Sequence, residues 1–155
     1  MELIKGAPVS AKKINMEMTN MQADMILGQL NTIYAFLMKN SELVPCTLSA
    51  GLAKNIRKIQ EELKEYFEEK RKLLQKYDIT TDAQINSTEN GQKFLAEFNP
   101  LSMENSGVEF HKMRMTFSEV CDVIENCQGI LEGDIMILQL ICKDESENED
   151  QKEGE

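Results

Sequence analysis

The chain has 155 residues, of which 41% are hydrophobic and 28% charged, a balance typical of one soluble globular domain and not of a disordered chain. The formal net charge of −10 argues against nucleic acid as the main partner, because phosphate groups attract lysine and arginine. No stretch approaches the ~20 apolar residues of a membrane span, and no signal segment is evident. We therefore expect a cytoplasmic protein without membrane association, whose four cysteines stay reduced and mostly buried.

The N-terminal part of the chain predicts an arm, a strand and a helix. Residues 1–12 contain glycine, proline and serine and are expected to form an irregular arm. Apolar residues alternate with polar ones over residues 13–18, which predicts a short strand with one buried face. Thr19 or Asn20 can then cap a helix over residues 21–39.

The rest of the chain is organised around residues 50–77, which predict its longest helix. Residues 40–48 form the connection that precedes it, and Thr47 or Ser49 is the expected cap. Apolar residues recur at spacings of three or four, interrupted only at Lys70, which places them on one face of the helix. The residues of this stripe are Leu52, Ile56, Ile59, Leu63, Tyr66, Leu73 and Tyr77. We expect the stripe to face the core and the charged residues opposite it to face solvent.

Shorter elements are predicted after the long helix. Residues 78–90 are polar and turn-rich, which predicts a mobile loop. A short helix then extends to Phe98, where Asn99 and Pro100 are expected to stop it. Alternating residues predict a second strand over residues 108–117.

The last third of the chain predicts two helical segments and a tail. In the second strand, alternation places these residues on one face: His111, Met113, Met115 and Phe117. A brief helical turn is expected to end at Gly129, and Gly133 and Asp134 are expected to cap a helix over residues 135–143. Residues 144–155 have no apolar residue and carry six of the ten net negative charges, so we expect a disordered acidic tail.

Together these elements predict an α+β fold that is mostly helical, in which one long central helix packs with shorter helices and a small two-stranded sheet. Residues 13–143 are expected to form a single globular domain between the arm, residues 1–12, and the tail, residues 144–155. An isolated pair of strands is only marginally stable, so we expect the helices to cover it.

No pattern typical of an active site is evident. The one histidine, His111, lies inside a predicted strand, and no local motif frames any of the cysteines. Cys121 and Cys127 lack the spacing of a zinc knuckle, and the eight glycines stand singly, without a phosphate-binding loop. We therefore predict a protein that is not an enzyme and has no catalytic residues, no cofactor and no metal. The remote alternative is an enzyme that uses His111 with a cysteine.

Two charged segments form the candidate interaction surface. Four cations close the long helix, where they suit the negative end of the helix dipole, so a structural role stays open for them. The acids of the tail suit a basic partner surface. The candidate residues are Lys70, Arg71, Lys72, Lys76, Asp144, Glu145, Glu147, Glu149 and Asp150.

From Leu52 to Tyr77 the string LAKNIRKIQEELKEYFEEKRKLLQKY resembles small proteins of phages and prophages of Gram-positive bacteria that are grouped as domain of unknown function 1617. Residues 13–18, 111–117 and 133–142 fall where the layout of that family has a strand, a second strand and a last helix. The resemblance implies a virus-encoded protein that acts in the bacterial host cytoplasm or on the virion. It implies no catalytic residues.

These inferences favour a non-enzymatic, phage-encoded accessory factor that binds a host or phage protein, as an inhibitor of a host or defence protein or as an adaptor. The alternative is a virion morphogenesis component or assembly chaperone, such as a tail or connector accessory. That alternative predicts a homo-oligomer. In both cases we expect a protein partner, no direct binding to nucleic acid and no membrane.

Overall fold

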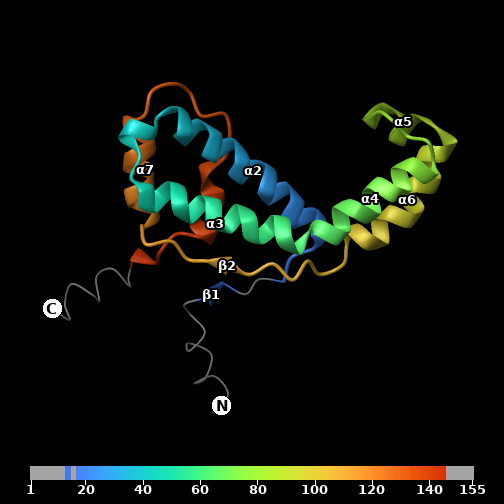
Figure 1. Ribbon diagram of the computed structural model, residues 1–155, viewed down its shortest axis with the longest axis horizontal. Coiled ribbons are helices and arrows are strands. Elements are labelled where there is room, and N and C mark those ends of the chain that lie inside the picture. The colour runs from blue at the N-terminus through green and yellow to red at the C-terminus, as the bar shows by residue number, and fades with distance from the viewer. Residues whose placement is uncertain (1–12, 15–16, 146–155) are drawn as a thin grey trace, which may run out of the picture.

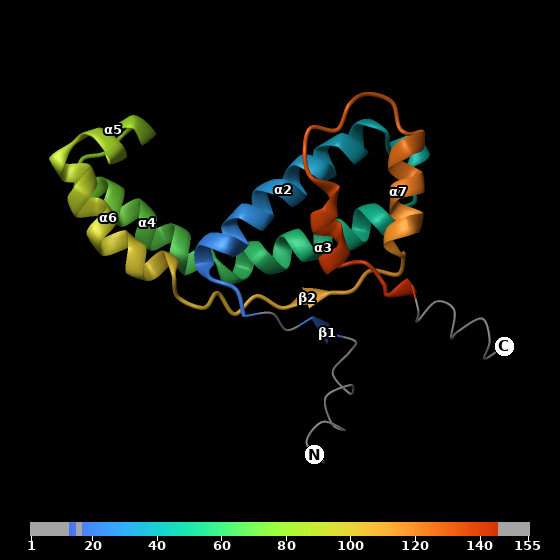
Figure 2. The same ribbon diagram turned by 180° about the vertical axis from the view of Figure 1, so that it is seen from behind.

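The helices form a body from which a helical arm extends, as the computed structural model shows (Figures 1 and 2). The structure describes residues 13–14 and 17–145, and most of these residues are helical. The mostly helical class is therefore confirmed. The predicted irregular arm, residues 1–12, and most of the predicted acidic tail, residues 146–155, lie outside the described residues.

The body is built on α2 (Asn20–Lys39) and α3 (Cys46–Glu62), which run in opposite directions and pack along each other (Figure 1). The 3₁₀ turn η2 (Ser41–Leu43) joins them in the predicted connection. Thr19 caps α2 as predicted. Its hydroxyl accepts from the Gln22 N–H at 3.1 Å, and the Gln22 side chain accepts from the Thr19 N–H at 2.9 Å, so both exposed donors are satisfied.

The arm consists of α4 (Lys64–Lys76), α5 (Asp82–Ser87) and α6 (Glu89–Ser102). α4 and α6 lie side by side, and α5 lies at the tip farthest from the body (Figures 1 and 2). Aromatic rings fill the space between α4 and α6, with centroid distances of 5.1 Å for Phe94 and Phe98 and 5.5 Å for Tyr66 and Phe98. Such ring pairs add to the apolar burial that holds the arm together.

From the arm the chain returns along α3 as an extended segment that contains β2 (Phe110–His111) and leads to α7 (Phe117–Asn126) (Figure 1). β1 (Lys13–Ile14) pairs with β2 in antiparallel register, with Lys13 opposite His111. The 3₁₀ turn η3 (Ile135–Leu140) then packs against α2. The return of the chain thus covers the α2–α3 pair from two sides.

One apolar core joins the elements of the body. Its most deeply buried residues come from α2, α3, the return segment, α7 and the residues around η3: Leu30, Ile33, Leu37, Leu48, Leu52, Ile59, Leu63, Val108, Val120, Leu138 and Ile141. Each buried aliphatic side chain contributes about 1.5–3 kcal/mol relative to its exposed state. The predicted stripe of the long helix is confirmed to face this core from Leu52 as far as Tyr66.

The long helix predicted over residues 50–77 is divided into α3 and α4, because the backbone turns at Leu63 (φ −92°, ψ 4°). α3 packs against α2, whereas α4 packs against α6, so the one apolar stripe meets two partners in two directions (Figure 1). The helical segment also begins earlier than predicted. α3 starts at Cys46 with Pro45 as its N-cap, so Thr47 and Ser49 lie inside the helix and do not cap it.

The segment predicted as a loop, residues 78–90, contains α5 and the first residues of α6. Thr81 caps α5, and Thr88 caps α6 by accepting from the Gly91 N–H at 2.9 Å. Threonine favours turns and helix caps for the same reason, since its hydroxyl bonds to nearby backbone groups. The polar composition of this segment therefore marks two closely spaced helix starts, and the prediction of a loop was wrong.

The short helix predicted to stop at Asn99 and Pro100 continues to Ser102. A proline inside a helix removes a backbone donor and its ring crowds the preceding turn. Pro100 lies in the last turn of α6, two residues before the helix ends, so little of the helix remains to be disrupted. The predicted inward face of this helix is correct at Phe94, which is 1% exposed.

β-structure is more limited than predicted, and its phase differs. Of residues 108–117 only Phe110 and His111 form a strand, and Phe110 is buried whereas His111 is exposed. The prediction that His111 shares a face with Met113 was therefore wrong, because Phe110 takes the core position and Met113 becomes buried only after the chain leaves the strand.

The last predicted helix is the shorter and tighter 3₁₀ turn η3. Its predicted cap is confirmed, since the Asp134 side chain accepts from the Met136 N–H at 2.9 Å. The preceding predicted helical turn is α7, which Thr116 and Glu119 cap reciprocally.

Candidate functional site

The four predicted cations of α4 are each engaged by a group of the arm. Lys70 places its ammonium 5.6 Å from the centroid of the Phe98 ring. The other three form ion pairs: Arg71 with Glu68, Lys72 with Glu69 at 3.8 Å, and Lys76 with Glu97 at 2.9 Å. Exposed pairs of this kind add little to stability because solvent screens them, but they neutralise the charge of these cations. The arrangement supports the structural role for these cations.

The pair formed by Lys76 and Glu97 belongs to a small network that joins α4 to α6. The Tyr77 hydroxyl also donates to Glu97, and together the two donors hold the pKa of that carboxyl below its usual value. Earlier in α4, the hydrogen bond from Arg71 likewise lowers the pKa of the Glu68 carboxyl. Arg71, Lys72 and Lys76 are thus each paired with a carboxylate of the arm.

The predicted acidic residues lie at the other end of the molecule. Asp144 and Glu145 follow η3 beside α7, and Ser118 Oγ donates to Glu145 Oε2 at 2.8 Å. Glu147, Glu149 and Asp150 lie outside the described residues. Figures 1 and 2 place α4 and the end of the described chain at opposite ends. The six candidate residues that the structure describes therefore do not form one continuous surface.

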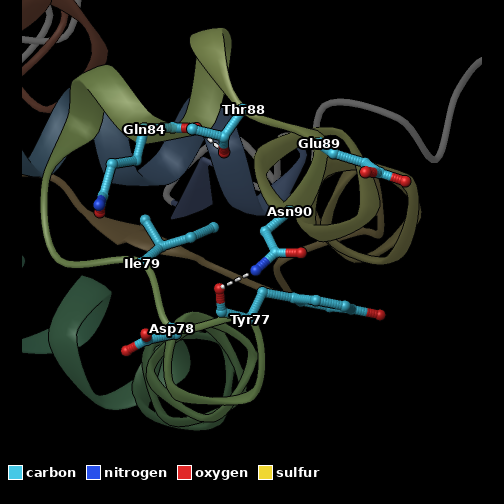
Figure 3. Close-up of a pocket in the computed structure, with 7 residues that line it drawn as sticks. All are labelled: Tyr77, Asp78, Ile79, Gln84, Thr88, Glu89 and Asn90. Carbon is cyan, nitrogen blue, oxygen red and sulfur yellow. Dashed lines mark hydrogen bonds between the residues drawn. The ribbon is translucent and has the colours of Figure 1, made fainter.

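A hollow of about 350 Å³ lies at the tip of the arm, between the end of α4 and the α5–α6 junction (Figure 3). Several of its polar groups are occupied by the fold. Asn90 Nδ2 donates to the Tyr77 carbonyl at 3.1 Å, and Thr88 caps α6, while Ile79 lies to the left of Asn90 in the view. Because these groups hold the α4–α6 turn together, we assign this hollow a structural role.

A second hollow, also of about 350 Å³, lies between α3 and the residues that follow β2. We call it the basic hollow. Lys54 of α3 lines one side, Lys112 and Arg114 line the other, and the exposed His111 lies beside them. None of the residues that line it is acidic.

Asn55 fixes the two walls of the basic hollow relative to each other. Its side chain is fully buried and pairs with both backbone groups of His111: Nδ2 donates to the His111 carbonyl at 2.9 Å, and Oδ1 accepts from the His111 N–H at 2.8 Å. A buried amide with both ends satisfied is a strong constraint on geometry. It holds His111 close enough to Lys54 and Lys58 of α3 for both charges to act on the imidazole.

Gly51 allows the segment of residues 112–114, which forms the wall opposite Lys54, to approach α3 closely. A Cβ atom at this position would lie 2.7 Å from Cγ and Sδ of Met113, well inside van der Waals contact. The absence of a side chain therefore lets Met113 pack directly on the helix, with Arg114 exposed beside it.

The cations around the basic hollow give it a positive field. No ion pair engages Lys54, Lys58 or Arg114 within the part of the chain that the structure describes. Partial burial and then the charges of Lys54 and Lys58 lower the pKa of His111, so this imidazole is neutral at pH 7. In contrast to Arg71, Lys72 and Lys76 of α4, Lys54, Lys58 and Arg114 are available to an anionic group.

Sequence reasoning missed this site because its residues come from two distant segments. Lys54 and Lys58 are four residues apart on one face of a helix, and this spacing alone could have indicated a local cluster of cations. Nothing in the sequence placed residues 112–114 beside them, since that neighbourhood depends on the pairing of Asn55 with His111.

The cysteines bear on the remote possibility of an enzyme. Cys46 lines the basic hollow with His111, but no hydrogen bond joins the two side chains. Burial raises the pKa of Cys121 and Cys127, and it raises the pKa of Cys142 to about 12. A nucleophilic cysteine needs a depressed pKa, so these three thiols lack the required activation.

Among the described residues no group of three histidine, cysteine or acidic side chains lies close enough together to hold a metal ion. Nor does any helix in this part of the chain have the length and apolar character needed to cross a membrane.

No protein-family model, curated protein or solved structure matches this chain. The resemblance to the phage family thus stays a prediction from the sequence string, and the geometry of the basic hollow carries the functional argument.

Proposed function

We propose that the chain is a non-enzymatic accessory factor that binds an acidic segment of a partner protein in the basic hollow. The observation that supports this proposal is the convergence of Lys54, Lys58 and Arg114 around His111, with no ion pair to any of the three cations in the described part of the chain. Such a site stands out in a chain whose net charge is −10.

The chemistry of the basic hollow suits a polypeptide better than a nucleic acid. Its lining mixes cations with the apolar side chains of Ala50 and Met113, so it can contact both a carboxylate and the carbon atoms around it. A long polyphosphate backbone would extend beyond the hollow and meet the net negative charge of the remaining chain. A short acidic peptide needs only the local field.

We further propose that the protein is phage-encoded and acts in the bacterial host cytoplasm on a host or defence protein, as an inhibitor or an adaptor. The support is the resemblance of the string from Leu52 to Tyr77 to the phage and prophage family. Lys54, Asn55 and Lys58 all lie within that string.

The test measures the affinity of a fluorescein-labelled decaglutamate peptide by anisotropy at low ionic strength. Exposed charge pairs contribute up to about 1 kcal/mol each, so Lys54→Glu with Arg114→Glu is expected to weaken binding about tenfold or more. Binding by the unaltered chain should also weaken as salt is added.

The matched control reverses two exposed cations of the arm, Lys64→Glu and Lys93→Glu, which change the net charge by the same amount. This variant should keep most of the affinity, because its changes lie away from the basic hollow. Equal losses in both variants would show that only net charge matters and would contradict the proposal. Tighter binding of a 20-base-pair DNA duplex than of the peptide would also contradict it.

The second candidate function is a virion morphogenesis component or assembly chaperone that self-associates. The apolar stripe of the long helix is largely buried in the fold, so a second copy would have to use other apolar surface. Met21 and Met25 on α2 are 44% and 61% exposed and are the observation that favours this candidate. Light scattering that gives a strict monomer at high concentration, together with absence from purified virions, would exclude it.

A further inference from the structure

The end of the described chain lies beside one wall of the basic hollow. The Met113 N–H donates to the Ile141 carbonyl at 2.7 Å, and the Lys143 N–H donates to the Met115 carbonyl at 2.8 Å. Residues 113–116 and 141–143 are therefore neighbouring segments, and Thr116 and Lys143 form a parallel bridge. The ten residues that follow Glu145 start next to the segment that carries Arg114.

These ten residues, 146–155, carry negative charges, which are absent from the lining of the basic hollow. They contain five acids and one lysine, whereas no acid lines the hollow. Ten residues span up to roughly 33 Å when extended, and Glu145 is tied to Ser118, four positions beyond Arg114. The tail is therefore long enough to turn back onto the hollow, and a tethered segment has an effective concentration of about millimolar.

We propose that the acidic tail, residues 146–155, docks in the basic hollow of its own chain and competes there with the acidic segment of a partner. The inference rests on the proposed function for the identity of the competitor, but docking of the tail does not require a partner. A docked tail competes with weak acidic ligands, and a partner segment that binds more tightly than the tail displaces it. Because the contact is electrostatic and exposed, salt weakens it.

The test uses His111, the only histidine in the chain, as a probe. Its C–H resonances are followed by NMR through a pH titration of the full chain and of a full-length variant with a neutral tail: Glu147→Gln, Glu149→Gln, Asp150→Asn, Glu153→Gln and Glu155→Gln. Nearby carboxylates favour the imidazolium ion, so neutralising the tail should lower the pKa of His111 by about 0.5 at low ionic strength. In 0.5 M salt the difference should vanish.

A second pair of variants controls for net charge. With Lys54→Gln and Arg114→Gln already in place, the same five tail substitutions should no longer change the pKa of His111, because the docking site is missing. An identical His111 titration for the full chain and the neutral-tail variant at low salt would overturn the inference. So would an equal shift in the presence and absence of the hollow cations.

The failure of this inference and the failure of the proposed function are distinguishable. If the tail docks, the neutral-tail variant should bind decaglutamate at least threefold more tightly than the full chain. If both chains bind the peptide equally and His111 does not respond to the tail, the proposed function stands and the inference fails. If His111 responds but neither chain binds the peptide, the inference stands and the proposed function fails.

Discussion

At the scale of single residues, the buried side chain of Asn55 holds the two segments of the candidate site together by hydrogen bonds. It is fully buried, and its amide bonds to the His111 N–H and carbonyl and to the Gly51 carbonyl. Asn55→Ala should lower the free energy of unfolding by about 2–3 kcal/mol, because it leaves backbone groups of the return segment without partners. Urea denaturation monitored by circular dichroism measures this change.

Asn86, exposed on α5, provides the control for this prediction. Asn86→Ala should change the free energy of unfolding by less than about 0.5 kcal/mol, as is usual for surface positions. A loss below that level for Asn55→Ala would mean that the return segment does not depend on this contact, and the described wall of the basic hollow would then be incorrect.

The cysteines give a second prediction at this scale. Cys46 is exposed, whereas Cys142 is 4% exposed and burial raises its pKa to about 12. Since the thiolate is the reactive form, iodoacetamide at pH 8 should modify Cys46 first and Cys142 only after denaturation. Peptide mapping by mass spectrometry gives the order. Modification of Cys142 in the native chain as fast as Cys46 would contradict its placement in the core.

At the scale of elements, the α5–α6 junction depends on Gly91. A Cβ atom there would lie 2.2 Å from the Ile85 carbonyl oxygen and 2.4 Å from that of Gln84, and both are backbone atoms that cannot move aside. Gly91→Ala should therefore lower the free energy of unfolding by about 1–3 kcal/mol.

Gly28 in the middle of α2 is the matched comparison, because a Cβ atom there meets nothing within 4 Å. Gly28→Ala should raise the stability by up to about 1 kcal/mol, since alanine has the higher helix propensity. Thermal and urea unfolding of the two variants test both statements. A Gly91→Ala variant as stable as the unaltered chain would refute the tight junction.

Local rules predicted several elements well, and long-range packing explains the rest. Thr19 and Asp134 were identified as caps because capping depends only on nearby residues. The turn at Leu63 could not be predicted, since the stripe around it has ordinary helical spacing and the change of direction follows from the two helices that it meets. The predicted face of His111 was wrong for a similar reason, because the neighbouring Phe110 occupies the core position.

At the scale of the whole molecule, the arm and the body differ in how their cations are paired. Arg71, Lys72 and Lys76 of α4 form ion pairs within the arm, while no ion pair engages Lys54, Lys58 or Arg114 in the described part of the body. The described chain ends beside the segment that carries Arg114 and far from the arm (Figure 2). The sequence predicted which segments are charged, but only the fold shows which charges already have partners.

The most direct test of the basic hollow as the binding surface is a ¹H–¹⁵N correlation spectrum of the full chain, recorded while decaglutamate is added at low ionic strength. We expect the largest shift changes at Lys54, His111 and Arg114, and only small changes over residues 70–76. The largest changes over residues 70–76, or no localised change at any peptide concentration, would contradict the central claim.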